Sequence, residues 1–337
     1  MKAIVYRKIG DPSVLELIER DVPVPGPGEV RIRIHASGIN PTDWRGRSST
    51  AWPMPYPEVT PHHDGGGVID AVGPGVETFA SGDRVWVMMA GLGYNTGTAQ
   101  EFTVVPASWV RPLAENASFD VGASLGIPAL TAHRALTVAE DGPRRLAPNA
   151  LDGRTVLVTG GAGAVGHAAI QLARWAGATL ITTVSGPEKA ALASAAGAHH
   201  VVNYREGDPA AEIRAVAKDG VDIIVDVAVA KNIDLDLATL KNGGTIAVYA
   251  DDRPKVELDI LQTLQLNARF QFLLIFLDRE RMAVAADDVT AAVRDGAMGV
   301  GEEHGLPVVR FPLAETAAAQ LASQNGAVGK MIVDPTM

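Results

Sequence analysis

The chain of 337 residues contains no cysteine. This absence excludes disulfide bonds, catalysis by a thiolate and every zinc site that uses a cysteine ligand. Positive charge is also scarce, because 29 lysines and arginines stand against 39 aspartates and glutamates and give a formal charge of −10. A surface with this excess of negative charge repels nucleic acid and anionic lipid. We therefore expect neither as a partner.

Long apolar runs are missing as well. The apolar run Phe270–Leu277 is far shorter than the roughly 20 residues that span a bilayer. A buried strand explains this run more simply than the lining of an acyl pocket does. Met1–Tyr6 begins at once as a strand-like run, without the pattern of a signal peptide. The sequence therefore predicts a cytoplasmic protein without a membrane span.

The N-terminal third has the pattern of short strands between turns. Val30, Ile32 and Ile34 alternate with polar residues, which places the three side chains on one buried face. Glycine and proline clusters punctuate the remainder, at Pro23–Gly28, Gly65–Gly67, Gly73–Gly75 and Ser81–Asp83. This pattern predicts a partly open β-barrel.

Strand-like and helical runs then alternate. The strand-like runs are Thr155–Thr159, Leu180–Val184, Val201–Val202, Val221–Val227 and Thr245–Ala250, with helical runs between them. Strict alternation predicts a doubly wound parallel sheet, a Rossmann-type domain over residues 126–277. The final run Lys330–Val333 looks like a strand that rejoins the first domain. That domain is therefore expected to be discontinuous, with residues 1–125 and 278–337.

A glycine-rich loop follows the first buried strand of this second domain. Gly161, Gly163 and Gly166 have the spacing in which glycines allow a tight turn, close approach of a pyrophosphate, and close packing of helix on strand. The phosphate then lies on free N–H groups at the positive end of the helix dipole. We therefore predict a dinucleotide site on the whole loop: Gly160, Gly161, Ala162, Gly163, Ala164, Val165 and Gly166.

The end of the next strand indicates which dinucleotide binds. An NAD site usually places an acid there, about 20 residues after the glycines, to hold the ribose 2′-OH. Here Leu180–Gly186 contains no acid, whereas Ser185 precedes a helix start and Lys189 lies in its first turn. A hydroxyl donor and a cation fit the 2′-phosphate of NADPH. The alternative is that Ser185 only caps the helix and Lys189 is a solvated surface residue.

The chain resembles the zinc-independent quinone oxidoreductases of the medium-chain dehydrogenase/reductase superfamily, the zeta-crystallin-like branch. The resemblance runs nearly end to end, and the glycine loop also fits the Gly-x-x-Gly-x-x-Gly form of that family. The segments that carry it, besides the loop, are Lys2–Val5, His35–Asp43, Asp64–Gly73, Gly82–Val85, Gly126–Ala132, Asn203–Arg205 and Gly326–Met331.

The resemblance implies a GroES-like, partly open β-barrel catalytic domain beside a Rossmann cofactor domain, with the active cleft between them. It implies NADPH as cofactor and homodimers as the common assembly. It also implies cofactor contacts by Lys189 and Tyr204, with Arg205 a weaker candidate. The nicotinamide is expected near Asn40 and Thr131, a ribose beside Tyr249 and Ala250, and the cofactor under the loop Asn325–Lys330.

A metal site is the main alternative to be weighed. Zinc-dependent relatives carry a cysteine at the position of Asn40 and a His-Glu pair at His63-Asp64. His63, Asp64 and Asp43 offer nitrogen and oxygen ligands, but the usual third position offers only Ile127 or its neighbours. A catalytic zinc needs three firm protein ligands. We therefore expect no metal.

The chain departs from the family around the expected pocket. Arg45 stands where relatives often carry a tyrosine, and a second pocket tyrosine is matched only loosely, by Ala51 or Trp52. Arg45 either attracts a carboxylate or polarises a carbonyl, or it is a solvated loop residue. His62 and His63 replace small residues and are expected to hydrogen-bond in or near the cleft. Residues 139–149 look longer than the usual connection and are expected to form a surface excursion without chemistry.

With a hydride donor but no thiol, the expected reaction is reduction of an electron-poor acceptor, a quinone. Donors around Asn40 would stabilise the developing oxyanion, or Asn40 would hold the ribose or the nicotinamide amide. Tyr94 and His63 are candidate proton donors, and water is an alternative. Asp43 is either part of this site or a capping acid. Reduction of alkenals, enones or enoyl thioesters is the alternative reaction, and a non-catalytic, crystallin-like NADPH-binding protein is the alternative of another class.

Overall fold

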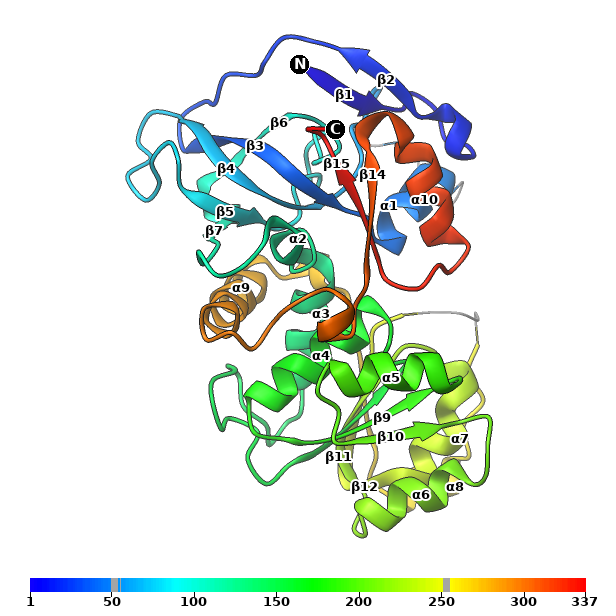
Figure 1. Cartoon of the computed structure of the whole chain (residues 1–337). Helices are drawn as coiled ribbons and strands as arrows, with labels where there is room; N and C mark the ends of the chain where they lie inside the picture. The colour runs from blue at the N-terminus through cyan, green and yellow to red at the C-terminus, as the bar shows by residue number, and fades with distance from the viewer. Residues whose placement is uncertain (50–53, 55, 251–254) are drawn as a thin grey trace. The chain divides into compact units, whose positions relative to one another are not determined.

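The computed structural model describes residues 1–49, 54, 56–250 and 255–337. These residues form two compact units (Figure 1). Unit 1 comprises Met1–Pro128, Val293–Val300 and Pro307–Met337, and unit 2 comprises Ala129–Ala292 and Gly301–Leu306. The chain thus leaves unit 1, completes most of unit 2, and returns to unit 1 for its C-terminal segment.

Unit 1 is built on a mixed sheet of seven strands. The order is β14 (Val308–Pro312), β15 (Lys330–Asp334), β3 (Glu29–Gly38), β4 (Asp64–Val72), β5 (Arg84–Val87) and β7 (Val110–Pro112), and β6 (Phe102–Pro106) also pairs with β3. A separate hairpin joins β1 (Lys2–Val5) to β2 (Glu16–Glu19). Val30, Ile32 and Ile34 lie in the core, as their alternation predicts. The sheet has the GroES-like architecture that was expected.

The helices that lie wholly in unit 1 are short. They are α1 (Pro41–Ser48), α2 (Phe119–Gly122) and α10 (Thr316–Gln324), with single turns η1 (Pro12–Val14), η2 (Ala107–Trp109) and η5 (Leu313–Glu315). Helix α1 starts with Pro41 at its first position, where a missing N–H costs nothing. Strand β15 pairs antiparallel with β3, so the predicted C-terminal strand lies beside the strand that leads into α1.

Unit 2 contains a sheet of six parallel strands. Their order is β10 (His200–Asn203), β9 (Thr179–Val184), β8 (Thr155–Thr159), β11 (Val221–Asp226), β12 (Leu240–Val248) and β13 (Arg269–Phe272). Its helical segments are α4 (Ala164–Trp175), α5 (Pro187–Ala195), α6 (Pro209–Val216), α7 (Val229–Thr239), α8 (Ile260–Gln265), η3 (Ile275–Leu277) and η4 (Glu302–His304). Helices α3 (Gly126–Leu136) and α9 (Arg279–Arg294) have residues in both units. This strand order is the Rossmann order, which confirms the predicted doubly wound sheet.

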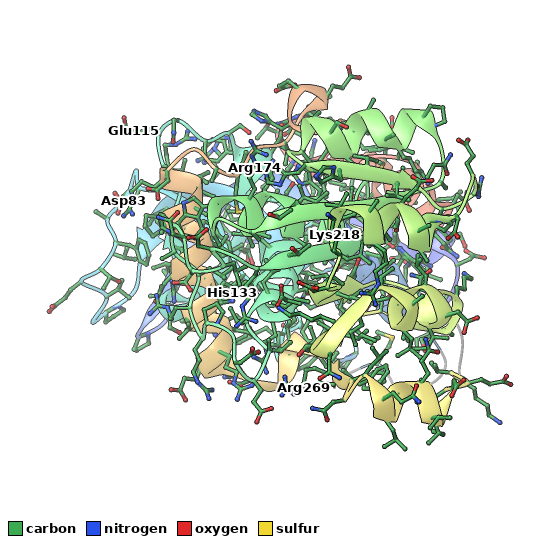
Figure 2. The ribbon with its side chains drawn as sticks, turned by 90° about the horizontal axis from the view of Figure 1, so that it is seen from below. Asp83, Glu115, His133, Arg174, Lys218 and Arg269 are labelled. Atoms are coloured by element: carbon green, nitrogen blue, oxygen red, sulfur yellow. The ribbon has the colours of Figure 1, made fainter. Side chains whose placement is uncertain are left out.

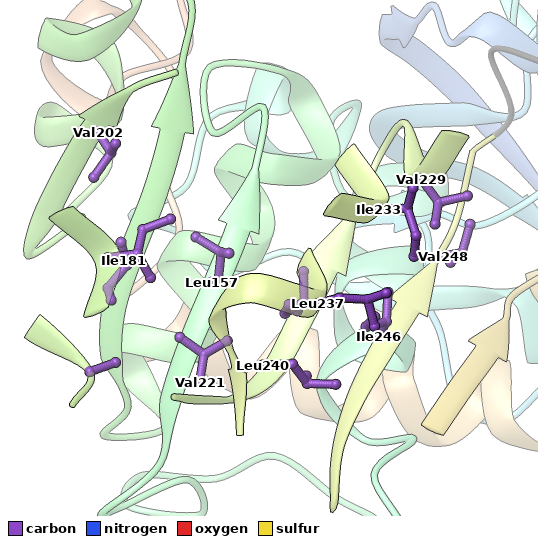
Figure 3. Packing of buried hydrophobic residues seen from close by; sticks show 13 residues of the cluster. Leu157, Ile181, Val202, Val221, Val229, Ile233, Leu237, Leu240, Ile246 and Val248 are labelled. Carbon is purple, nitrogen blue, oxygen red and sulfur yellow. The ribbon is translucent and has the colours of Figure 1, made fainter. Parts of the chain in front are cut away.

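The core of unit 2 explains why its strands read as continuous apolar runs. Leu157, Ile181, Ile224 and Ile246 come from four neighbouring strands and are fully buried. Figure 3 shows side chains of this cluster on β8, β9, β11, β12 and α7. A parallel strand covered by helices on both faces buries every side chain, which removes the polar alternation.

The prediction of a buried strand at Phe270–Leu277 is wrong. Strand β13 ends at Phe272 and pairs, among the described strands, with β12 alone. Phe272 is 65% exposed and Leu274 is 58% exposed. A short apolar run has the same pattern in a central strand and at a sheet edge, so the sequence alone could not separate the two.

The predicted surface excursion at residues 139–149 is anchored by Asp288, and also by ion pairs of Glu140 with Arg269 and of Asp141 with Arg154. Asp288 of α9 accepts hydrogen bonds from Arg145 Nε (2.8 Å) and from the backbone N–H of Leu146 (2.8 Å). His133 of α3, labelled in Figure 2, lies 2.8 Å from the same carboxylate. Although burial acts to raise the pKa of Asp288, the hydrogen bonds from His133 and Arg145 bring it below its usual value.

Within the described ranges, no helix is both long and apolar enough to span a bilayer.

Candidate functional site

The glycine loop follows β8 directly, and each glycine has its own steric reason. Gly160 has a φ of +69°, a conformation that side chains disfavour. A Cβ on Gly166 would lie 2.4 Å from the carbonyl oxygen of Gly160, and one on Gly161 would lie 2.1 Å from Thr182 Oγ1. These two glycines therefore allow the close packing of α4 on the strands.

Gly163 is different, because its missing side chain leaves space open. A Cβ at this position would meet only the Gly160 carbonyl oxygen, at 3.4 Å. Gly163 is the N-cap of α4, and no side chain caps this helix start. The N–H groups of the first turn, which include those of Ala164 and Val165, therefore border open space at the positive end of the helix dipole. This geometry fits a bound pyrophosphate.

The end of β9 lies next to this loop. The backbone N–H of Gly160 donates to the carbonyl oxygen of Thr183 at 3.1 Å. Gly186, rather than Ser185, is the N-cap of α5, so the alternative in which Ser185 caps the helix is wrong. Ser185 is half-buried one residue before that cap, and Lys189 is exposed in the first turn. The first acid after β9 is Glu188, on α5 and beyond the strand end where an NAD site carries its acid.

The end of β10 brings a further predicted residue to this edge. The backbone N–H of Tyr204 donates to the carbonyl oxygen of Val184 at 3.1 Å, which places Tyr204 beside the residue that precedes Ser185. Its ring is half-exposed, and the guanidinium of Arg205 lies 5.9 Å from the ring centroid. The carboxyl ends of β8, β9 and β10 thus bring together the glycine loop, Ser185 and Tyr204.

On the other side of β8, the carboxyl ends of β11 and β12 carry two polar side chains, the fully buried Asp226 and the half-buried Tyr249. Tyr249 follows β12, and its N–H donates to the carbonyl oxygen of Asp226 at 3.1 Å. Burial, and then the charge of Asp226, raises the pKa of Tyr249. The same two causes raise the pKa of Asp236 on α7 well above its usual value. Sequence reasoning predicted Tyr249 but missed the two aspartates, because nothing in their local pattern marks them as neighbours.

For two more predicted cofactor residues, Thr131 and Ala250, the structure gives the burial but no contact that indicates a ligand. Thr131 is largely buried on α3, and Ala250 is half-buried directly after Tyr249. Neither position identifies a ligand.

In unit 1, Asn40 lies in a buried polar network. Its Oδ1 accepts from Lys330 Nζ at 2.8 Å, and its Nδ2 donates to Asp64 Oδ2 at 2.7 Å. Lys330 is fully buried, also donates to the carbonyl oxygen of Ile39, and lies 4.0 Å from Asp64. The amide of Asn40 is therefore fixed in one orientation by a cation on one side and a carboxylate on the other.

Asp43 closes the first turn of α1. Its Oδ2 accepts from the backbone N–H of Asn40 at 2.6 Å, which confirms the capping role considered for it. Burial raises the pKa of Asp43 to about 8; the Asn40 N–H opposes this shift and the charge of Asp64 adds to it. Burial likewise raises the pKa of Asp64 to about 6, against the charge of Lys330. Asp43 is consequently mostly protonated at neutral pH.

A cavity of about 330 Å³ lies beside Asp43 in unit 1. Asp43, His63 and Tyr94, three of the five predicted catalytic residues, line it together with Tyr6 and His62. Burial lowers the pKa of His63 to about 4, so this imidazole is neutral at pH 7. The sequence pattern had no means of placing Tyr6 here, since it comes from the N-terminal strand region.

His62 belongs to a directed chain of hydrogen bonds. Thr98 Oγ1 donates to the carbonyl oxygen of Asp64 at 2.8 Å, so the hydrogen in the 2.7 Å contact between Thr98 and Ser37 comes from Ser37 Oγ. His62 Nδ1 must then donate to Ser37 at 2.9 Å, which leaves Nε2 as acceptor, 3.2 Å from Gln320 Nε2. His62 is therefore the neutral Nδ1–H tautomer. Burial lowers its pKa to about 3, in keeping with this assignment.

Comparison with known proteins places this geometry in a family. Residues 26–115 match the alcohol dehydrogenase GroES-like domain, and residues 164–288 match the family described as zinc-binding dehydrogenase. The quinone oxidoreductase of Rattus norvegicus is 33% identical over 341 residues, which cover 99% of this chain and 97% of that protein. The Homo sapiens quinone oxidoreductase is 32% identical, with the same coverage of both chains.

The chain belongs to the quinone oxidoreductase family of medium-chain dehydrogenases/reductases. Solved structures agree with this assignment. A mycobacterial protein complexed with NADPH is 29% identical, with a TM-score of 0.79 and coverage of 99% of this chain and 100% of that one. An NAD-dependent alcohol dehydrogenase is 28% identical, with a TM-score of 0.82 and 99% coverage of both chains. A 2-haloacrylate reductase is 26% identical, with a TM-score of 0.78 and complete coverage of both.

Membership of the medium-chain family makes the chain an oxidoreductase of that type, but these neighbours differ in cofactor and substrate. The members therefore leave the choice of nicotinamide cofactor and of acceptor to the residues of this chain.

The metal alternative within this family meets a chemical obstacle. Across the described ranges, no group of three or more His, Asp or Glu side chains is arranged to hold a metal ion. Asp64 accepts from Asn40 and from the N–H of Ile127, and the ammonium of Lys330 lies 4.0 Å away. A dication beside that ammonium would be repelled. Independence of metal stays a prediction.

Two residues expected from the resemblance, Arg45 and Asn325, do not line the cavity. Arg45, where relatives often carry a tyrosine, is exposed on α1 with its guanidinium 5.4 Å from the Trp44 ring centroid, and it does not line the cavity. Asn325 is exposed at the end of α10, whereas Lys330, five residues later, is buried in unit 1. Ala51 and Trp52, the loose matches to a second pocket tyrosine, lie outside the described residues.

Proposed function

We propose that the chain is an NADPH-dependent reductase that transfers hydride to a quinone. The observation that carries the proposal is the carboxyl edge of the unit 2 sheet. There the glycine loop, Ser185 and Tyr204 lie on neighbouring strand ends, and the strand end that carries an acid in NAD sites carries none. Family membership supports the quinone as acceptor.

The cofactor choice rests on the groups that follow β9. The hydroxyl of Ser185 is a donor for a phosphate oxygen, and Lys189 supplies a counter-charge in the first turn of α5. The uncapped start of α5 adds free N–H groups. Together these groups suit the 2′-phosphate of NADPH better than a free 2′-OH.

The acceptor is assigned to the unit 1 cavity that Asp43, His63 and Tyr94 line. When bound, NADPH supplies the hydride; the protein must supply a proton to the reduced acceptor. His63 is neutral and therefore a poor acid, whereas Asp43 carries a proton at neutral pH. Because Asp43 Oδ2 accepts from the Asn40 N–H, the acid proton lies on Oδ1. We assign Asp43 as proton donor, with Tyr94 as the second candidate.

Asn40 then acts by position. Both ends of its amide are committed to Lys330 and Asp64, so its backbone N–H is held against Asp43 while its side chain stays fixed. Oxyanion stabilisation by the Asn40 side chain would require this network to open.

Reduction of an activated alkene is the second candidate function. It is favoured by the likeness to a 2-haloacrylate reductase, and it needs the same hydride and the same proton.

A homodimer is a further part of the proposal. Exposed apolar side chains gather on the edge strand β13 and on α8, namely Phe272, Ile260, Leu261 and Leu264. A second copy would cover them, and the predicted cytoplasmic location is kept with this proposal.

The test is an acceptor panel under one set of conditions. NADPH oxidation is measured with 1,4-benzoquinone, 9,10-phenanthrenequinone and an enone in parallel. We expect faster turnover with the quinones. Turnover with the enone alone would replace the quinone by the alkene, and tight NADPH binding without any oxidation would favour the non-catalytic alternative.

A further inference from the structure

His62 stands out among the residues that line the unit 1 cavity, because its backbone has a conformation that favours glycine. Its φ is +76°, and its side chain is buried. A residue other than glycine is strained in this left-handed region, and such strain gathers at functional sites, where the surroundings hold it. The chain thus keeps a large side chain here despite the strain, at a position where the family resemblance implies a small one.

Both ring nitrogens of His62 are held, each from a different element. Nδ1 donates to Ser37 Oγ of β3 at 2.9 Å, and Nε2 accepts from Gln320 Nε2 of α10 at 3.2 Å. Gln320 is itself fixed, because its Oε1 accepts from Nε of the buried Arg47 at 2.7 Å. The imidazole therefore stays in its place unless two hydrogen bonds break.

The cavity that His62 borders is small. Its volume of about 330 Å³ is near the lower end of the range of about 300–1,000 Å³ that small-molecule sites have. Among the described residues, Tyr6, Pro61 and Tyr94 also line it, and each carries a ring. A fixed side chain in the wall of a small cavity rejects a larger ligand by steric clash, which is one source of specificity.

We propose that His62 limits the size of the acceptor, so that the cavity takes a one-ring quinone in preference to a fused three-ring quinone. The imidazole fills space that a smaller residue would leave to the ligand, and Ser37 and Gln320 keep it there. This inference rests on the proposed function, since it takes the unit 1 cavity as the acceptor site. It adds a specificity-determining residue to that site and leaves the proton with Asp43.

The affinities of 1,4-benzoquinone and 1,4-anthraquinone for the full-length protein test the proposal. They are measured by rapid ultrafiltration in saturating NADP⁺, so that neither quinone is reduced. His62→Gly removes the imidazole, and glycine suits the φ of +76°, so the variant should fold. Water can then satisfy Ser37 and Gln320 in the enlarged cavity. We expect the ratio of the two affinities to shift at least about tenfold towards 1,4-anthraquinone.

Asn149→Gly is the matched control. Asn149 is another residue of positive φ, at +66°, but it is exposed in unit 2 and is not among the described residues that line the cavity. The substitution should therefore leave the affinity ratio unchanged.

A second substitution separates size from backbone strain. His62→Ala also removes the imidazole, but alanine keeps the unfavourable φ. It should shift the affinity ratio as far as His62→Gly does, while it melts at a lower temperature than that variant. An unchanged ratio in both folded variants, or an equal shift in Asn149→Gly, would overturn the proposal. Failure of the proposed function has a different sign, the absence of NADPH oxidation by any quinone in the wild-type chain, on which these affinities do not depend.

Discussion

Lys330 is a buried cation whose partners come from the other end of the chain. Its Nζ donates to the carbonyl oxygen of Ile39 and to Asn40 Oδ1, with Asp64 at 4.0 Å. The sequence identified Lys330 as a residue of interest through its family segment, and it also identified Asn40. Their contact depends on the pairing of β15 with β3 across 290 positions of sequence, which no local pattern encodes.

At Lys189 a single residue is expected to separate the two cofactors. Lys189→Ala removes the cation next to the proposed 2′-phosphate, so kcat/KM for NADPH should fall about tenfold. The value for NADH should change little, because NADH has no such phosphate. Lys218→Ala, an exposed lysine elsewhere in unit 2 and labelled in Figure 2, is the control. Equal losses with both cofactors would remove the phosphate assignment.

Asp43 is expected to give the pH profile of the reaction. Its pKa of about 8 means that the proton is present below that pH and lost above it, so kcat should fall as the pH rises through about 8. Asp43→Asn keeps an oxygen for the Asn40 N–H but has no acid proton, and it should lower kcat roughly 100-fold. KM for NADPH should stay the same. An unchanged kcat with the same pH profile would assign the proton to another group.

At the scale of elements, the spacing of apolar residues correctly predicted which faces of the central strands are buried. The alternation of Val30, Ile32 and Ile34 identified a strand with one buried face, and continuous runs such as Val156–Val158 identified strands covered on both faces. It failed at Phe270–Leu277, because edge or centre is decided by the order of strands in the sheet. Similarly, the helix start after β9 was predicted, but its cap is Gly186.

Lysine substitutions on the exposed edge formed by β13 and α8 should disrupt the proposed dimer. Phe272→Lys combined with Leu264→Lys places two ammonium groups on the face assigned to a second copy, where burial would be costly. We expect a shift from dimer to monomer in light scattering coupled to size exclusion. Val24→Lys, at an exposed apolar position of unit 1, is the matched control and should leave the dimer intact. A wild-type chain that is already monomeric would refute the proposed assembly.

For the whole molecule, the two fold types and their order along the chain could be predicted from the sequence, while the side-chain networks needed the structure. Arg47 bonds to Gln320 and Asn40 to Asp64, over separations of 273 and 24 residues. These contacts join α1 and its N-cap to α10 and β4, so they depend on how the elements of unit 1 pack. The cofactor edge was more predictable, because parallel strands deliver successive loops to the same side.

Removal of metal is expected to leave the reaction intact. Exhaustive dialysis against a chelator should change kcat with quinone by less than about twofold, since the Asn40 network already uses the groups that a zinc ion would need. Activity is compared before and after dialysis, with metal content measured in both samples. Loss of activity that zinc restores would overturn the metal-free mechanism.

The most direct measurement compares NADPH and NADH as donors to 1,4-benzoquinone with the same preparation. The account predicts steady turnover with NADPH and a kcat/KM at least about tenfold lower with NADH, because only NADPH offers a phosphate to Ser185 and Lys189. Equal use of both cofactors, or preference for NADH, would contradict the central assignment of the strand end after β9.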